Sequence, residues 1–104
     1  MDIFEALADP RRRQVVRLLS TRPHRAGELA EAAGMSPAAM SRHLKTLLDA
    51  GVVADERVPD DARLRVFKLQ PQSLIAVQAF LDQLQAEWNV QLGSFKRHVE
   101  AKRP

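Results

Sequence analysis

The chain has 104 residues and no cysteine, and its 16 Lys and Arg outnumber 13 Asp and Glu to give a formal net charge of +3. The absence of cysteine excludes disulfides, thiolate metal sites and cysteine nucleophiles, while the basic balance favours a polyanionic partner. The length predicts a single domain over residues 1–104 with a thin core. No run of residues is apolar enough to cross a membrane and no signal peptide opens the chain, so we expect a cytoplasmic protein.

Two short helices are expected at the start of the chain. The first spans residues 2–8, and its apolar side chains share one side: Ile3, Phe4 and Leu7. The second begins at Pro10, because Asp9 is a good N-cap and proline suits the first helical position, where no amide donor is needed. This second helix is expected to end near Ser20.

Six arginines and no acidic residue lie between Pro10 and Gly27. Three of them, Arg11–Arg13, stand at the start of the second helix, where the helix dipole slightly disfavours cations. They could hold DNA phosphates, or they could pair internally with Asp9 or Glu5. The sequence does not separate these two interpretations.

Residues 26–50 predict a helix-turn-helix. Neither residue before the third helix caps well, but Glu28 can accept from free amides in its first turn. Gly34 is expected to end that helix in the left-handed conformation, and Ser36 to cap the fourth helix. Four apolar residues then lie on one face of the fourth helix and anchor it to the core: Met40, Leu44, Leu47 and Leu48.

The outward face of the fourth helix is the candidate DNA-reading surface. Small residues there permit close approach to the major groove, an arginine can bind guanine through two hydrogen bonds, and hydroxyls and a lysine can hold phosphates. Free amides at the helix start also suit a phosphate. The candidate residues are Ser36, Ala38, Ala39, Ser41, Arg42 and Lys45, with Thr46 beside them. Taken alone, the same face could be an ordinary solvated surface.

The sequence contains three histidines. His43 follows Arg42 and is expected at the edge of the exposed face, where a phosphate or base contact is favoured over a structural hydrogen bond. A metal role is not expected, because no second ligand lies four residues further along the helix. His24 and His98 are solitary surface candidates without an assigned role.

Residues 52–69 predict a β-hairpin that follows the helix-turn-helix directly, which makes the element a wing. Its strands are expected over 52–58 and 64–69, joined by a polar loop over 59–63. The hairpin offers three further candidates for DNA contact, of which Arg63 near the tip is the best placed: Arg57, Arg63 and Arg65. Asp60 and Asp61 would oppose a close approach to DNA, so a solvated loop remains the alternative.

The last predicted helix spans about 72–100 and carries an apolar stripe at spacings of three and four residues: Val77, Leu81, Leu84, Trp88, Leu92 and Phe95. Such a stripe needs a partner along its length. Together with Ile3, Phe4 and Leu7 of the first helix it predicts a helical homodimer interface with two-fold symmetry. The alternative is a monomer whose long helix folds back on its own core.

Taken together, these segments resemble the ArsR/SmtB family of bacterial winged-helix repressors. The matching stretches are FEALADPRRRQVVRLL at 4–19, ELAEAAGMSPAAMSRHLKTLLDAGVV at 28–53 and VFKL at 66–69, with SRHLKTL at 41–47 the most specific. The resemblance implies a mainly α fold with a small β-hairpin. It further implies a dimeric repressor that binds an inverted-repeat operator in double-stranded DNA.

The sequence departs from the family's metal sensors. It has no cysteine pair on the recognition side, and Asp82 on the last helix is followed by Leu84 where the family's zinc and cobalt sensors would place a histidine. His98 and Glu100 remain, but two ligands at one helix end do not build a tetrahedral site. The resemblance therefore implies a metal-blind member without a cofactor, whose inducer is a small molecule, another protein or nothing at all.

Two other classes of function are alternatives to a DNA-binding regulator. An enzyme is not expected, because the chain has no Gly-rich phosphate loop and no HExxH motif, and Ser41 and His43 stand too close along one helix to act as nucleophile and base. A winged-helix module that binds protein and not DNA is the alternative to a regulator. Arg42 and Lys45 argue against that alternative, since it predicts an acidic or apolar face on the fourth helix.

Overall fold

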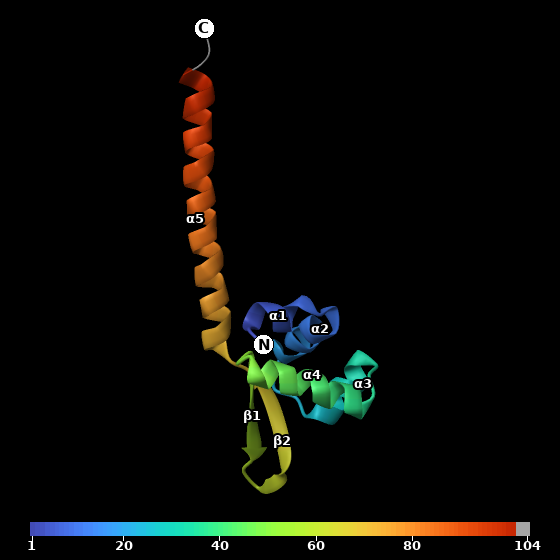
Figure 1. Ribbon diagram of the computed structural model, residues 1–104. Helices are drawn as coiled ribbons and strands as arrows, with labels where there is room; N and C mark the ends of the chain where they lie inside the picture. The colour runs from blue at the N-terminus through green and yellow to red at the C-terminus, as the bar shows by residue number, and fades with distance from the viewer. Residues whose placement is uncertain (102–104) are drawn as a thin grey trace. The chain divides into compact units, whose positions relative to one another are not determined.

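The computed structural model describes residues 1–101, apart from the side chain of Ala62. In chain order the elements are α1 (Ile3–Ala8), α2 (Pro10–Leu19), α3 (Ala26–Ala33), α4 (Pro37–Asp49), β1 (Val53–Val58), β2 (Asp61–Leu69) and α5 (Pro71–Ala101) (Figure 1). The chain forms two compact units, of which the first ends at Leu74 and the second begins at Ile75 within α5. The predicted fold class, mainly α with a small β-hairpin in winged helix-turn-helix order, is confirmed.

Three of the helices begin at a capping side chain, and the sequence predicts two of these caps, Asp9 and Ser36. Asp2 accepts a hydrogen bond from the Glu5 amide at 2.8 Å, Asp9 from the Arg11 amide at 2.7 Å, and Ser36 from the Ala39 amide at 3.1 Å. Each cap satisfies one of the amide groups that lack a partner in the first turn of a helix. The caps thereby fix the residues at which α1, α2 and α4 begin.

The start of α3 lacks a capping side chain at Arg25, and Glu28 takes over as predicted. One oxygen of its carboxylate accepts from the Arg25 amide at 3.0 Å, and the other pairs with the Arg22 guanidinium at 3.2 Å. The hydrogen bond from the Arg25 backbone, followed by that from Arg22, holds the pKa of Glu28 below its usual range. Gly34 then ends α3 in the left-handed conformation, with φ 66°.

Arg12 and Arg13 bind the C-terminal end of α1. The Arg12 Nε donates to the Ala6 carbonyl at 2.6 Å and its Nη1 lies 3.6 Å from the Asp9 carboxylate. Arg13 donates to the carbonyls of Leu7 and Ala8, both at 2.9 Å. These carbonyls have no partner within α1, so the two arginines cap its C-terminus. The geometry favours the internal interpretation for these two, whereas Arg11 makes no ion pair within the described residues.

The core of the first unit gathers one or more residues from each of α1–α4 and the hairpin. Met40, Leu44 and Leu47 of α4 are 0–2% exposed, which confirms them as the apolar anchor of that helix. Leu48, at the margin of the same face, is half-buried. The full set of buried apolar residues is Ala6, Val15, Leu19, Leu29, Ala30, Met40, Leu44, Leu47, Val52, Val53 and Phe67. Burial of one face of α4 leaves its other face outward.

The hairpin is longer on its second strand than predicted. β2 begins at Asp61, which pairs with Val58, and only Pro59 and Asp60 form the turn, so the expected five-residue loop over 59–63 is wrong. The register shifts between Arg57 and Val58. A turn of two residues allows pairing to continue almost to the tip. Arg65 pairs with Arg57 in the register, while Arg63 lies in the irregular stretch between Asp61 and Arg65.

His24 is buried, which corrects its prediction as a surface residue. It is 6% exposed and forms an isolated antiparallel bridge with Phe67, through hydrogen bonds of 3.0 and 2.7 Å between the two backbones. Its ring Nδ1 lies 2.8 Å from the Arg22 carbonyl. The segment between α2 and α3 is thereby fastened to the inner edge of β2.

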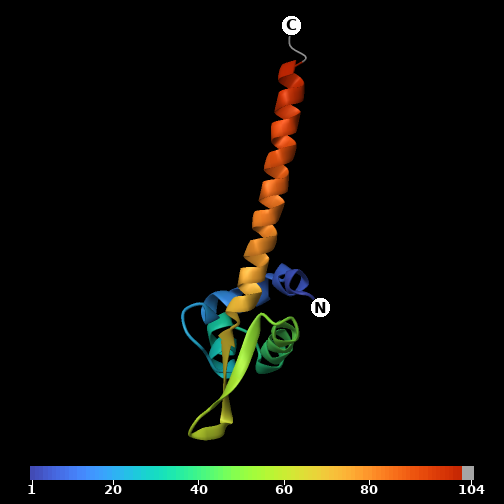
Figure 2. The same ribbon diagram turned by 90° about the vertical axis from the view of Figure 1, so that its left-hand side faces the viewer.

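The second unit is the greater part of α5, a continuous helix in Figure 2. No residue of α5 is buried. Gln78, Gln83 and Gln85 each donate to the carboxylate or amide oxygen four residues further on, at 2.8 to 3.4 Å. Pairs at this spacing support a helix that makes few tertiary contacts.

Candidate nucleic-acid interface

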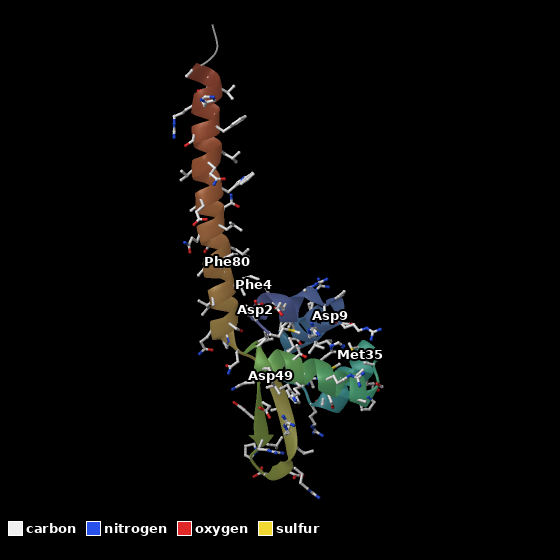
Figure 3. All side chains as sticks on the ribbon, viewed as in Figure 1. Asp2, Phe4, Asp9, Met35, Asp49 and Phe80 are labelled. Atoms are coloured by element: carbon white, nitrogen blue, oxygen red, sulfur yellow. The ribbon has the colours of Figure 1, made fainter. Side chains whose placement is uncertain are left out.

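The outward face of α4 is accessible along the helix. Figure 3 labels Met35 and Asp49, which mark the turn before α4 and its last residue. Of the predicted DNA-contacting residues, Ser36, Ala38, Ser41, Arg42 and Lys45 are exposed, while Ala39 and His43 are half-buried. The structure therefore presents two hydroxyls, two cations and a methyl group on the helix that follows the turn.

A groove of about 470 Å³ runs between α4 and β2. We call it the α4–β2 groove; it is lined by Arg25, Ala26, Ser41, Leu44, Lys45, Leu48, Arg63, Leu64, Arg65 and Phe67. It brings together four predicted residues from two elements, Ser41 and Lys45 from α4 and Arg63 and Arg65 from the wing. Its lining includes four cations and no acidic residue. A concave surface lined by cations attracts a polyanion, and the carboxylates that pair with Arg63 and Arg65 weaken that attraction.

Arg25 is a groove residue that the sequence did not single out. It stands just before α3 and comes to the groove because the bridge between His24 and Phe67 draws this segment against β2. Its membership in the cationic run between Pro10 and Gly27 was the available signal. The long-range pairing that places it cannot be read from local pattern.

A second hollow, of about 270 Å³, lies at the helix-turn-helix turn. It brings Ser36 and Ala39, at the start of α4, beside Arg11 and Gln14 of α2. A helix start with a nearby arginine favours an anionic group. Arg11 thus differs from Arg12 and Arg13, which are bound to the end of α1.

The wing cations are held by carboxylates of the same hairpin. The Arg63 Nε lies 3.2 Å from Asp61, the Arg65 Nη2 lies 2.6 Å from Asp55, and Lys68 pairs with Glu56. The Arg65 guanidinium also lies over the Phe67 ring, 5.1 Å from its centroid. Arg57 is exposed on β1 and stands opposite Arg65 in the register.

His43 lies toward α2 and lines neither hollow. The Arg11 amide lowers the pKa of Asp9 the most, and the charges of Arg12 and His43 add to that effect. His43 is half-buried. His43 is thus close enough to Asp9 to act on its charge, and the predicted contact of His43 with a phosphate or base stays a prediction.

The candidate dimer residues divide by burial. Ile3 and Leu7 are half-buried and pack on the core, and Phe4 is 46% exposed. In α5, Leu81, Leu84, Trp88, Leu92 and Phe95 are 47–66% exposed, and Val77 is half-buried. Val99, four residues after Phe95 and 39% exposed, extends this apolar series although it was not among the predicted dimer residues. We call these seven residues, Val77, Leu81, Leu84, Trp88, Leu92, Phe95 and Val99, the α5 stripe.

Within residues 1–101, no group of three or more His, Cys, Asp and Glu side chains is arranged to hold a metal ion. His98 and Glu100 therefore have no third side chain of that kind within this part of the chain. The helices described in this range are also too short or too polar to span a membrane.

Comparison with known proteins places these features in one family. A family model described as "Bacterial regulatory protein, arsR family" matches residues 9–55. The chain is 35% identical over 99 residues to the HTH-type transcriptional regulator Rv2034 of Mycobacterium tuberculosis, covering 95% of this chain and 87% of that protein. It is 38% identical over 56 residues to the transcriptional repressor SdpR of Bacillus subtilis, covering 54% and 62% of the two chains.

Solved structures agree over most of the chain. An ArsR-like transcriptional regulator from Rhodococcus sp. RHA1 superposes with a TM-score of 0.81 at 26% identity, covering 91% of this chain and 87% of that one. A crystal structure of another ArsR family transcriptional regulator gives 0.73 at 33% identity, covering 84% and 87%. The homodimeric winged helix-turn-helix DNA-binding domain of Mb0332 from Mycobacterium bovis gives 0.63 at 25% identity, covering 85% and 78%.

Proposed function

The chain belongs to the ArsR family of bacterial transcriptional regulators, and on this premise we propose that it is a homodimeric repressor that binds an inverted-repeat operator. It is a DNA-binding regulator and not an enzyme. The observation that carries the proposal is the α4–β2 groove, where Ser41 and Lys45 of α4 lie beside Arg63 and Arg65 of the wing. Four cations without an acidic residue suit a phosphate backbone.

Within this proposal the residues of α4 divide into two roles. Arg42 is exposed and stands outside the groove, where its guanidinium can bind a guanine through two hydrogen bonds. Lys45 and Ser41 line the groove and hold phosphates, as do Ser36 and Arg11 at the turn. Ala38 and Ala39 allow the backbone of α4 to approach the base edges.

The dimer is proposed to form along the α5 stripe, with Phe4 and its neighbours in α1 adding to it. An exposed apolar series of this length is unusual on a monomer. Two-fold symmetry would set the two α4 helices to address successive major grooves, about 34 Å apart. Residues 1–104 would then act as one functional domain in the cytoplasm, where promoter DNA is found. Residues 102–104 lie outside the described range.

The effector is proposed to be something other than a metal ion. What supports this is the sequence, which has no cysteine and places Leu84 where the family's zinc and cobalt sensors would place a histidine. The inducer is then a small molecule or another protein, or the repressor acts without one.

Selection of duplexes from a randomised pool by the purified protein tests the proposal. We expect enrichment of an inverted repeat, bound by two protomers, with affinity that falls steeply as salt rises because counterions are released from the DNA. Binding to the selected duplex is then compared with a scrambled duplex, with and without added zinc. Failure to enrich any sequence would refute specific recognition and favour the protein-interaction alternative. Loss of binding on adding zinc would refute metal blindness.

A further inference from the structure

The wing is electrically neutral, whereas the helical part is basic. Between Val53 and Leu69 four acidic residues accompany four basic ones: Asp55, Glu56, Asp60 and Asp61 against Arg57, Arg63, Arg65 and Lys68. Between Pro10 and Thr46, eight Lys and Arg accompany two Glu. Long-range attraction to DNA therefore comes from the helices, and the wing adds little to it.

Arg65 is held by two hydrogen bonds and a ring contact. Its Nε and Nη2 donate to one oxygen of Asp55, at 2.9 and 2.6 Å, and its guanidinium lies over the Phe67 ring. Arg65 lines the α4–β2 groove, while Asp55 does not. The carboxylate thus holds a groove arginine from outside the groove. Both side chains are about two-fifths exposed, so a phosphate oxygen can reach the guanidinium.

We propose that Asp55 sets the affinity for the operator, because it competes with a DNA phosphate for Arg65 and gives way only when α4 is seated on the operator. This inference rests on the proposed function. On random DNA, α4 makes no base contacts that fix the wing, so the carboxylate retains Arg65 and no phosphate contact forms. On the operator, α4 holds a phosphate beside Arg65, and the phosphate displaces Asp55. Asp55 thereby withholds one cation per wing from non-specific binding.

The exchange is weak enough to occur on the operator. An exposed ion pair of this kind corresponds to a factor of about 1.5 to 5 in an equilibrium constant. Removal of Asp55 should therefore tighten operator binding by about that factor. On random DNA it should allow a phosphate contact at each wing. This contact steepens the logarithmic salt dependence of binding by at most about 0.9 per wing, and it tightens binding by less than on the operator.

Asp55→Asn tests the proposal against Asp60→Asn. Both variants remove one negative charge from the hairpin, but Asp60 makes no ion pair within the described residues. We expect Asp55→Asn to steepen the salt dependence on random DNA and to leave the slope on the operator unchanged. The ratio of operator to random affinity should rise, because only the operator complex has to displace the carboxylate. Asp60→Asn should leave both slopes near wild type. Equal slopes for the two variants would overturn the proposal.

Arg65→Gln completes a double-mutant cycle and gives a second route to the answer. The single variant should weaken operator binding and leave the slope on random DNA unchanged, and in its presence Asp55→Asn should no longer steepen that slope. A shallower slope on random DNA for Arg65→Gln would overturn the proposal, since it would place Arg65 on phosphates there. Circular dichroism checks that each variant is folded.

The two levels of inference fail separately. If the wild-type protein shows no preference for any duplex, the proposed function is lost whatever the wing variants do. If the wild type prefers an operator while Asp55→Asn and Asp60→Asn behave alike, only the role of Asp55 is lost.

Discussion

Replacement of Trp88 by alanine removes the largest side chain of the α5 stripe. The stripe repeats every 11 residues, from Val77 to Trp88 to Val99, which keeps it on one side of a nearly straight helix. Trp88 is 56% exposed, and a tryptophan presents up to about 250 Å², so about 140 Å² per protomer is available for burial. At about 25 cal/mol per Å², complete burial would contribute about 3.5 kcal/mol per protomer.

The expected loss in the dimer is smaller than this ceiling. Alanine retains part of the buried area, and an interface seldom covers a side chain completely. If half of the available area is buried, the two copies together contribute about 3.5 kcal/mol to dimerisation, which corresponds to a dissociation constant more than 100-fold weaker (about 1.4 kcal/mol for each factor of ten). Sedimentation equilibrium over a range of protein concentrations measures that constant directly.

Val90→Ala is the matched control. Val90 is 67% exposed on the same helix, and it stands two residues from Trp88, which is about 200° around the helix axis. Its replacement should leave the dimer unchanged. If Trp88→Ala stays dimeric at concentrations where the wild type does, or if both variants dissociate equally, the assignment of the interface to this stripe is refuted.

Other predictions separate roles that the structure assigns to neighbouring residues. Arg42→Ala should cost about 1 to 3 kcal/mol on the operator and relax sequence preference. Lys45→Gln should weaken binding to operator and scrambled duplexes alike and reduce the salt slope by about 0.9 per protomer. Filter binding at several salt concentrations separates the two. Gly34→Ala should destabilise the fold by about 1 to 2 kcal/mol, because φ is 66° at this position, although an added Cβ would meet nothing within 4 Å. Gly27→Ala, at an equally open but helical position, should stabilise the fold by about 0.5 to 1 kcal/mol. Chemical denaturation measures both changes, and free energies of unfolding that shift in the same direction would contradict this reasoning. The hydrogen bond from the Arg11 amide lowers the pKa of Asp9 in the folded protein. The carboxylate therefore contributes stability above its unfolded pKa of 3.8, and this contribution is lost as pH falls through the folded pKa. Asp9→Asn, which caps equally well, should lose less stability in acid than the wild type, and an acid unfolding profile unchanged by the substitution would count against the cap.

Local signals predicted the helical part because each depends on a few adjacent residues. Asp9-Pro10 and Ser36-Pro37 set the starts of α2 and α4, and Gly34 set the end of α3. The apolar spacing from Met40 to Leu47 fixed which face of α4 turns inward, and so which face can read DNA. In these segments the capping and packing preferences agree with the fold, so sequence and structure coincide.

The predictions failed where placement depends on pairing between distant segments. β2 begins three residues earlier than expected, because hairpin pairing continues through Asp61 to a two-residue turn. His24 is buried because its backbone bonds to Phe67, 43 positions along the chain. That bridge also carries Arg25 into the α4–β2 groove. Neither partner shows a local pattern from which such a bridge could be predicted.

The charges of the wing follow from the same dependence on strand register. Counted along the sequence, Arg63 and Arg65 add two cations to a DNA-binding surface that Asp60 and Asp61 would oppose. In the hairpin, Asp55 meets Arg65 across the strands, and Glu56 meets Lys68, at separations of 10 and 12 residues. The opposing charges on β1, together with Asp61 beside Arg63, thus act on individual cations and not on the wing as a whole. Attraction by the helices and selective release of the wing cations are then separate properties, and they can be altered by different substitutions.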